Sequence, residues 1–454
     1  MATQYFTSKD KFFMSRPVYR TPTRSGIETV TVAQTSCTDD FMGFGLALTG
    51  SSCYLLNEMK REERSALLRD VFSPQGLNLS VARLSIGASD YSAELYSYDD
   101  VPFDTQLEHF SVAKDEAYII PMIQEVLKVR PDLYLFASPW SPPGWMKTGG
   151  ELCGGYMREE FVECYASYIV KFIQAYAVHG IPIHALTPQN ECETQQNGRM
   201  PACIWHPEIE AKFIKILRQK LDAAGLNVEI WMHDHGFNAT NRVLWMLDNL
   251  EGLKEACDGV AFHYYHGYTE MTLPVGQRHP ELALHFTEGG PRLYDNYATD
   301  WCKWMMQMVK VLQCGYKSFT GWNLMLDETG WPNIGPFSCG GLITRNSVTG
   351  ELSYSGQYRA FQHIAKYITP QSKIYALQTD LPGVNAIHKY PKHQLPVDGV
   401  MIDNGDGHPV LVMVNPDRGP VGTTDTEGRR TQVLVNGTWW YIELMPESVT
   451  TVIL

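Results

Sequence analysis

The sequence predicts an α/β protein: a (β/α)8 barrel with an additional antiparallel β-sandwich side domain. Short apolar segments alternate with segments of helical period through the middle of the chain, as in a parallel sheet covered by helices. Eight such apolar segments can be counted, the number that closes a barrel. Residues 371–454 instead hold only short strand-like segments separated by turn residues.

The chain divides into three parts on this pattern. Residues 28–36, "ETVTVAQTS", alternate apolar and polar side chains, so we assign residues 1–38 to one or more N-terminal strands that join the side domain. Residues 39–370 form the predicted catalytic barrel, and residues 371–454 form the predicted β-sandwich. The strands expected in this last part are "NAIHKY", "GVMIDN", "HPVLVMVN", "TQVLVNGTWWYIEL" and "SVTTVIL".

The barrel strands follow from short apolar runs. They lie near Phe44, Leu79, Leu133, Ile183, Asn227, Gly259, Leu282 and Ser318. Helical periodicity between them predicts helices over 56–72, 161–180 and 207–225, and the last two end at glycine, a common helix C-cap. A doubly wound open sheet is the competing fold, but "GFGLALTG" lacks the glycine spacing of its phosphate-binding turn.

Composition narrows the function classes. The net charge of −13, without a basic run, argues against nucleic acid and anionic membrane surfaces as partners. No stretch reaches the roughly 18 apolar residues of a membrane helix. The first residues lack a signal-peptide core, so we expect a cytoplasmic protein, or a secreted one whose signal peptide is absent from this chain. Aromatic residues reach 12%, which suits sugar stacking as well as core packing.

Cysteine usage excludes a metal or redox framework. The ten cysteines are scattered without a CxxC pair, so we expect mostly free, buried thiols. Cys192 and Cys203 bracket a short loop, and a disulfide between them is left open. Cys203 and His206 in "CIWHPE" lack the partner pair that a metal site needs.

Polar and aromatic residues gather where the predicted strands end. In (β/α)8 barrels these carboxyl ends build the active site. The residues at these ends are Asp90, Trp140, Asn190, Glu191, His233, Asp234, His235, His263, Tyr265, Glu288, Trp322 and Asn323. Their convergence on one barrel mouth is hard to explain by core packing.

Glu191 and Glu288 stand out because burying a carboxylate at a strand end is costly unless it is used. They end strands on opposing sides of the ring, so their side chains can come within the roughly 5–5.5 Å of a retaining glycosidase pair. The alternatives are a helix first-turn carboxylate for Glu191 and a turn acceptor for Glu288. Glu193 is the local rival for the acid role.

We interpret the other conspicuous acidic and histidine residues as structural. His233, Asp234 and His235 look like a metal site, but alternate residues of a strand point to opposite faces, so we predict no metal there. Asp327 and Glu328 are interpreted as loop and turn acids.

Six motifs, in order, resemble glycoside hydrolase family 30, of clan A, over roughly residues 41–454. They are "FMGFGLALTGSS", "ARLSIGASDYS", "ASPWSPPGWMKTGG", "TPQNE", "FTEGG" and "WNLMLDETGWPN". That family includes glucosylceramidases of the acid β-glucosidase type, β-1,6-glucanases, β-xylosidases and xylanases. The resemblance implies a TIM barrel with a β side domain and a retaining mechanism.

The resemblance also implies roles for individual residues. Glu191 is implied as the acid/base and Glu288 as the nucleophile. The residues implied to bind substrate are Asp90, Trp140, Asn190, His263, Tyr265, Trp322 and Asn333. Asp90 and Trp140 would hold the 4- and 6-hydroxyl side of a glucose, Asn190 its 2-hydroxyl. Cys192 departs from the proline that often follows the acid/base in this family.

We therefore predict a retaining β-glycosidase acting on β-glucosides, of the glucosylceramidase or β-glucosidase type, on a carbohydrate or glycolipid substrate. An endo-β-1,6-glucanase is the first alternative, a β-xylosidase the second, and a non-catalytic carbohydrate-binding barrel the third. No cofactor or metal is required. Glu191 is expected to have a raised pKa, because burial and the charge of Glu288 disfavour its ionised form. The oligomeric state stays open.

Overall fold

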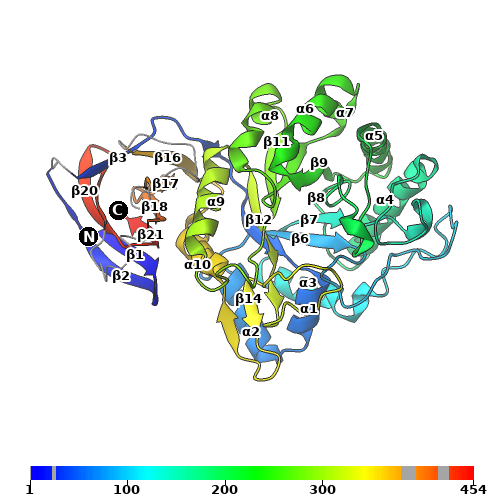
Figure 1. Ribbon diagram of the computed structural model, residues 1–454, viewed down its shortest axis with the longest axis horizontal. Coiled ribbons are helices and arrows are strands. Elements are labelled where there is room, and N and C mark those ends of the chain that lie inside the picture. The colour runs from blue at the N-terminus through cyan, green and yellow to red at the C-terminus, as the bar shows by residue number, and fades with distance from the viewer. Residues whose placement is uncertain (1, 23–26, 380–394, 418–428) are drawn as a thin grey trace. The chain divides into compact units, whose positions relative to one another are not determined.

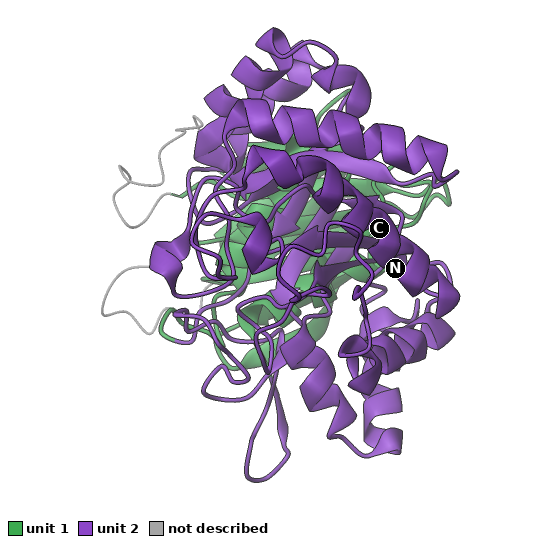
Figure 2. Cartoon of the chain, turned by 90° about the vertical axis from the view of Figure 1, so that its right-hand side faces the viewer, with its two compact units in different colours: residues 1–43, 294–317, 354–454 green, residues 44–293, 318–353 purple. Residues whose placement is uncertain are grey.

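The computed structural model describes residues 2–22, 27–379, 395–417 and 429–454 of the chain. These residues form two compact units, coloured separately in Figure 2. One unit comprises residues 44–293 and 318–353, and the other comprises residues 1–43, 294–317 and 354–454.

The barrel unit, residues 44–293 and 318–353 (unit 2 in Figure 2), is built on a closed barrel of eight parallel strands (Figure 1). The strands, in barrel order, are β5 (Gly43–Ala47), β6 (Val81–Ile86), β7 (Tyr134–Pro139), β8 (Ala185–Leu186), β9 (Glu229–Gly236), β10 (Gly259–His263), β11 (Ala283–Glu288) and β12 (Ser318–Asn323). Each coincides with a strand predicted from the sequence. The predicted (β/α)8 barrel is therefore confirmed.

The strands are buried on both faces, which is why they read as apolar runs rather than as alternating patterns. Close approach between neighbours demands small residues at some positions. A Cβ at Gly45 would lie 2.1 Å from the carbonyl oxygen of Val81 on the adjacent strand, so only glycine fits there.

Helices lie outside the barrel strands (Figure 1). They are α1 (Gly50–Asn57), α2 (Arg61–Phe72), α3 (Ile119–Val129), α4 (Val162–Val178), α5 (Pro207–Ala223), α6 (Thr240–Asn249), α7 (Leu253–Ala256) and α8 (Leu273–Arg278). A small sheet of β13 (Met325–Leu326), β14 (Ile343–Arg345) and β15 (Leu352–Tyr354) completes the strands that follow β12. The predicted helices over 161–180 and 207–225 correspond to α4 and α5.

The prediction of a single helix over 56–72 is wrong, because α1 ends at Asn57 and a separate helix, α2, begins at Arg61. Lys60 is extended, with ψ of 140°, so the helix cannot run through it. The Nη1 atom of Arg64 donates to the carbonyl oxygens of Leu56, Asn57 and Met59, which satisfies the end of α1. Helical periodicity continues across this break, so the pattern alone could not reveal it.

The β-sheet unit (unit 1 in Figure 2) contains a ten-stranded, mostly antiparallel sheet that closes through an added pairing of β16 with β17. Its strand order is β17 (Asp398–Asp403), β18 (Val410–Asn415), β21 (Ser448–Ile453), β1 (Ala2–Ser8), β2 (Lys11–Arg20), β20 (Thr438–Leu444), β19 (Arg429–Val435), β3 (Glu28–Val32), β16 (Lys373–Thr379) and β4 (Thr38–Asp39). The predicted side β-domain with N-terminal strands is present.

Helices α9 (Trp301–Gln313) and α10 (Gly356–Ile364) also group with this β-sheet unit, whereas the sequence-based division placed both within 39–370. Its core is apolar and includes Val30, Leu411 and Val433, each nearly inaccessible. The strand predicted for "NAIHKY" lies outside the described residues. None of the described helices combines the length and apolar character that crossing a membrane requires.

Candidate active site

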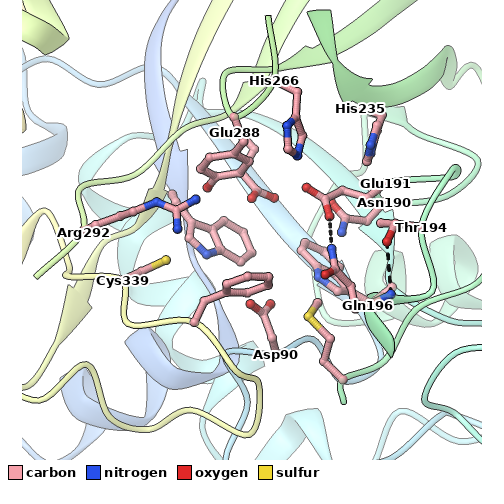
Figure 3. A pocket seen from close by; sticks show the side chains of 15 residues that line it. Asp90, Asn190, Glu191, Thr194, Gln196, His235, His266, Glu288, Arg292 and Cys339 are labelled. Carbon is pink, nitrogen blue, oxygen red and sulfur yellow. Dashed lines mark hydrogen bonds between the residues drawn. The ribbon is translucent and has the colours of Figure 1, made fainter. Parts of the chain in front are cut away.

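A cavity of about 280 Å³ opens among the loops that follow the barrel strands (Figure 3). Its walls carry an unusual share of ionisable and aromatic side chains. They are Asp90, Trp140, Asn190, Glu191, Thr194, Gln196, Met200, His235, Tyr265, His266, Glu288, Arg292, Trp322, Phe337 and Cys339. Seven of the nine predicted site residues are in this set. His263 and Asn333 are not.

The two glutamates face one another across this cavity (Figure 3). Glu288 is the last residue of β11, and Glu191 follows β8 in a left-handed conformation with φ of 50°. Such backbone is uncommon outside glycine and is held here by a hydrogen bond from Glu191 N to Asp234 O of 2.9 Å. One carboxylate oxygen of each glutamate lies within 4.8 Å of the other.

Arg83 joins several polar side chains at the bottom of the cavity, and it was not among the residues predicted from the sequence. It lies on β6 with no accessible side-chain surface. Its Nη1 contacts Glu288, its Nη2 donates to Asp234 (2.7 Å) and Asn190 (2.9 Å), and its Nε donates to Ser138 (3.1 Å). The available signal was a lone arginine in the apolar strand "VARLSI", because buried charges are rare without partners.

Asp234 points into the barrel, so the interpretation of "HDH" from strict alternation is wrong in part. His233 pairs with Ala261 and His235 with Phe262, which leaves Asp234 as the extra residue of a β-bulge. The φ values of 78° at His233 and 57° at Asp234 mark the bulge. The bulge re-aims the Asp234 carboxylate toward Arg83 instead of outward.

The three "HDH" residues do not converge on a common point, so they do not form the metal trio that the pattern first suggested. The His233 ring lies 3.8 Å from the Cys192 sulfur, and His235 lines the cavity. Asp234 accepts instead from Thr187 and Thr287, each at 2.7 Å.

His263 connects Asp234 to Glu191 from behind the cavity wall. Its Nε2 lies 2.9 Å from Asp234 and its Nδ1 lies 3.4 Å from Glu191. Burial lowers the pKa of His263, but the charges of Glu288 and Asp234 and the hydrogen bonds together raise it to about 9. At neutral pH its ring is therefore a cation that donates to carboxylates on both sides.

Glu191, His263 and Glu288 are also the described residues whose atoms cluster closely enough to hold a metal ion. A protonated imidazole has no lone pair to give, and both His263 nitrogens already face carboxylates. We therefore interpret the cluster as a proton-sharing network.

The expected raised pKa of Glu191 is contradicted. Burial raises the pKa of Glu191, but the hydrogen bond from His263, the charges of His235 and His263, and the hydrogen bond from Gln196 lower it to about 2. The pKa of Glu288 is raised instead, chiefly by burial and against the opposing charges of His263 and Arg83. Sequence proximity could not reveal these donors, which come from other strands and a loop.

Two tryptophans form an apolar surface in the site. The rings of Trp140 and Trp322 stack with centroids 5.2 Å apart and an interplanar angle of 19°. The Arg83 guanidinium carbon lies 4.8 Å from the Trp140 ring centroid. Such flat faces suit the apolar faces of a sugar ring.

Asp90 closes one end of the cavity. Its side chain is buried, and its Oδ1 has no hydrogen-bond partner among the described atoms. Burial raises the pKa of Asp90 well above its usual value, with the charges of Glu288 and Glu191 adding to the shift. Gly335 packs directly behind it, because a Cβ there would lie 2.6 Å from that of Asp90. A buried oxygen without a partner is suited to accept from a ligand hydroxyl.

Asn333 shapes the loop that supplies Phe337 and Cys339 rather than lining the cavity. Its Nδ2 donates to Phe337 O at 2.5 Å and its Oδ1 accepts from Gly335 N at 2.7 Å. Tyr265 does line the cavity, and burial and the neighbouring Glu288 raise its pKa well above the usual value.

The structure also shows the surroundings of Glu193, Asp327 and the cysteines. Glu193 points to Arg242, 3.7 Å away, and is absent from the cavity wall. Asp327 accepts from Thr329 and Trp331 backbone N–H groups, each at 2.8 Å, as expected of a turn acid. All ten cysteines are free thiols, Cys192 and Cys203 included.

Comparison with known proteins agrees with this geometry. Residues 41–368 match the glycosyl hydrolase family 30 TIM-barrel domain. "Putative glucosylceramidase 4" of Caenorhabditis elegans is 29% identical over 91% of this chain and 82% of its own length. An "Endo-1,6-beta-D-glucanase" of Neurospora crassa is 27% identical over 84% of this chain and 82% of its own. The solved structure of an endo-β1,6-glucanase superposes with a TM-score of 0.84 at 26% identity, over 99% and 98% of the two chains.

Proposed function

The chain belongs to glycosyl hydrolase family 30 and is a glycoside hydrolase, and from this premise we propose that it is a retaining β-glycosidase acting on β-glucosides. The observation that carries the proposal is the approach of the Glu191 and Glu288 carboxylate oxygens to within 4.8 Å. This approach fits the roughly 5–5.5 Å separation of a retaining pair better than the roughly 6.5–9.5 Å of an inverting pair, which must leave room for a water.

Glu288 acts as the nucleophile in this proposal. It attacks the anomeric carbon and forms a glycosyl-enzyme, while Glu191, which takes up a proton before this step, gives that proton to the departing oxygen. Glu191 then takes a proton from the water that hydrolyses the intermediate. Arg83 and Tyr265 hold the Glu288 carboxylate in place for attack. Asn190, which accepts from Arg83, lies beside the pair and offers its amide N–H to a sugar hydroxyl.

Asp90 and the tryptophan pair support a glucose-type ring. The Asp90 oxygen without a partner is a ready acceptor for hydroxyls at the end of the ring away from the cleaved bond. Trp140 and Trp322 offer stacking faces alongside.

An endo-β-1,6-glucanase is the second candidate, favoured by the close structural match to an enzyme of that name. It differs in requiring several sugars on the leaving-group side. A panel of p-nitrophenyl β-glycosides and β-1,6-glucan separates the two. We expect turnover of the glucoside above the xyloside. Activity on β-1,6-glucan with silence on every small glycoside would replace the proposal by the glucanase, and preference for the xyloside would overturn the role of Asp90.

Two variants test the assignments of the glutamates. Glu288→Gln should lower kcat by at least about 10³-fold with the fold intact, because an amide is not a nucleophile. Glu191→Ala should slow the first step for an unactivated phenyl glucoside by about 10²- to 10⁴-fold, but far less for a dinitrophenyl glucoside, since only the phenyl leaving group needs a proton. Proton NMR should show the β-anomer released first. Equal loss for both leaving groups would remove Glu191 from the acid role.

A further inference from the structure

The loop after Glu191 forms one wall of the cavity and touches the glutamate itself. Residues 192–200 connect β8 toward α5 and place Thr194, Gln196 and Met200 on the cavity surface (Figure 3). The Gln196 Nε2 donates to Glu191 Oε2 at 2.6 Å. This is a short hydrogen bond to a carboxylate, of the charge-assisted kind.

Both oxygens of Glu191 are occupied by donors in this arrangement. Oε2 accepts from Gln196, and Oε1 faces His263 Nδ1 at 3.4 Å. His263 is held by Asp234 on its other side and is buried, whereas Gln196 is carried on a loop with exposed neighbours. Gln196 is therefore the donor that can leave when a ligand enters.

The backbone at Gln196 is held in an unusual conformation. Gln196 and Asn197 have φ of 50° and 51°, and Gly198 follows with φ of 68°. Residues other than glycine adopt this region reluctantly, and such strain persists where surrounding contacts enforce it. The enforcing contact is a hydrogen bond from Gln196 N to Thr194 Oγ1 of 3.1 Å. The strained turn thus presents the Gln196 amide to Glu191.

We propose that Gln196 is a positioning residue that occupies Glu191 Oε2 in the empty pocket and must give way to the leaving group before Glu191 delivers its proton. This rests on the acid/base role proposed for Glu191. The donor position taken by Gln196 lies on the one carboxylate oxygen that His263 does not face, where a glycosidic oxygen would receive the proton. Filling the leaving-group side of the pocket exchanges an N–H donor for an acceptor, and the acceptor favours protonated Glu191.

Several charged or titratable groups face Glu191 and contribute to its ionisation besides Gln196. They are His235 on β9, His263 on β10, Tyr265 after β10, Glu288 on β11 and Asp90 after β6. All of them remain in a Gln196 variant, so a change on substitution isolates the contribution of this one amide.

The test uses Gln196→Met, which keeps the length of the side chain and removes the donor. Gln196→Gly is the second variant, since it relaxes the positive φ and should fold at least as well. Gln195→Met is the matched control, because Gln195 is exposed on the same loop. The ¹³C carboxyl resonance of Glu191, identified by its loss in Glu191→Gln, reports the titration directly. The alkaline limb of kcat/KM for phenyl β-glucoside reports it in catalysis.

Both Gln196 variants should raise the Glu191 titration midpoint by on the order of one pH unit, the worth of one hydrogen bond to a charged group. Above that midpoint, kcat/KM should rise by up to about tenfold for an unactivated phenyl glucoside and stay unchanged for a dinitrophenyl glucoside. A midpoint equal to that of Gln195→Met overturns the inference. A shifted midpoint in a chain that cleaves no glycoside supports the hold of Gln196 on Glu191 and removes the proposed function instead.

Discussion

Replacing Arg83 by methionine should lower the free energy of unfolding by an unusually large amount for a single substitution. The side chain is wholly inaccessible and contacts two carboxylates, those of Asp234 and Glu288, besides Asn190 and Ser138. Methionine fills a similar length but removes the guanidinium cation that contacts both buried carboxylates. Breaking a buried ion pair from one side costs about 3–5 kcal/mol of unfolding free energy, so we expect a loss in this range at pH 7.

The loss should depend on pH with a definite sign. Burial raises the pKa of Asp234, but Arg83 and His263 hold it far below its usual value. A depressed carboxylate pKa stabilises the fold above the unfolded-state value of about 3.9, and this stabilisation is lost as pH falls through the folded value. Without Arg83 that contribution disappears, so the gap between the native chain and Arg83→Met should widen from about pH 3 to pH 6.

Urea unfolding followed by tryptophan fluorescence at both pH values measures this gap. Arg83→Lys keeps the charge and should lose only about 1–3 kcal/mol, since the planar fork is missing. Arg278→Met is the surface control: Arg278 pairs with Asp248 at 2.8 Å but is 58% exposed, so it should lose less than about 1 kcal/mol. Arg83→Met behaving like Arg278→Met, with no dependence on pH, would refute the reasoning.

Two further stability predictions follow from other buried groups. The Asp115 carboxylate accepts a hydrogen bond of 2.6 Å from each of three buried tyrosine hydroxyls, those of Tyr96, Tyr98 and Tyr176. Asp115→Ala leaves these hydroxyls without their acceptor, so the free energy of unfolding should fall by about 3 kcal/mol. The control Asp132→Ala, at an exposed site, should lose under about 1 kcal/mol, and equal losses would contradict the prediction. The pKa of His263 is raised to about 9 in the folded chain. Protonated His263 therefore contributes stability that is fully present below about pH 6.5 and is lost as pH rises through 9. Urea unfolding at pH 6 and pH 9.5 should therefore show the native chain losing on the order of 3 kcal/mol more than His263→Gln, and parallel losses would count against a charged His263.

Much of the fold is local information and was readable from the chain. The eight strands are apolar on both faces because both faces are buried, so their positions show without knowledge of their partners. Helices α4 and α5 end before glycines with φ of 72° and 66°, as their sequences indicated. The break between α1 and α2 was not readable, since Arg64 and an extended Lys60 interrupt a periodicity that itself continues.

The residues of the candidate site also fall into those that the sequence revealed and those that it did not. Glu191 and Glu288 could be selected because polar residues at strand ends are conspicuous against apolar strands. Arg83 and Glu288 are 205 residues apart, and only closure of the barrel brings them into contact. Asp234 faces inward because of a bulge that strict alternation cannot encode.

The sequence by itself determined the barrel, the side β-domain and the two carboxylates at the barrel mouth, because burial imposes a pattern on each strand separately. The tertiary structure decided which charges those carboxylates meet. Their ionisation depends on His263, Arg83 and Gln196, donors placed by other strands and by a strained loop, and electrostatic interactions act through space rather than along the chain.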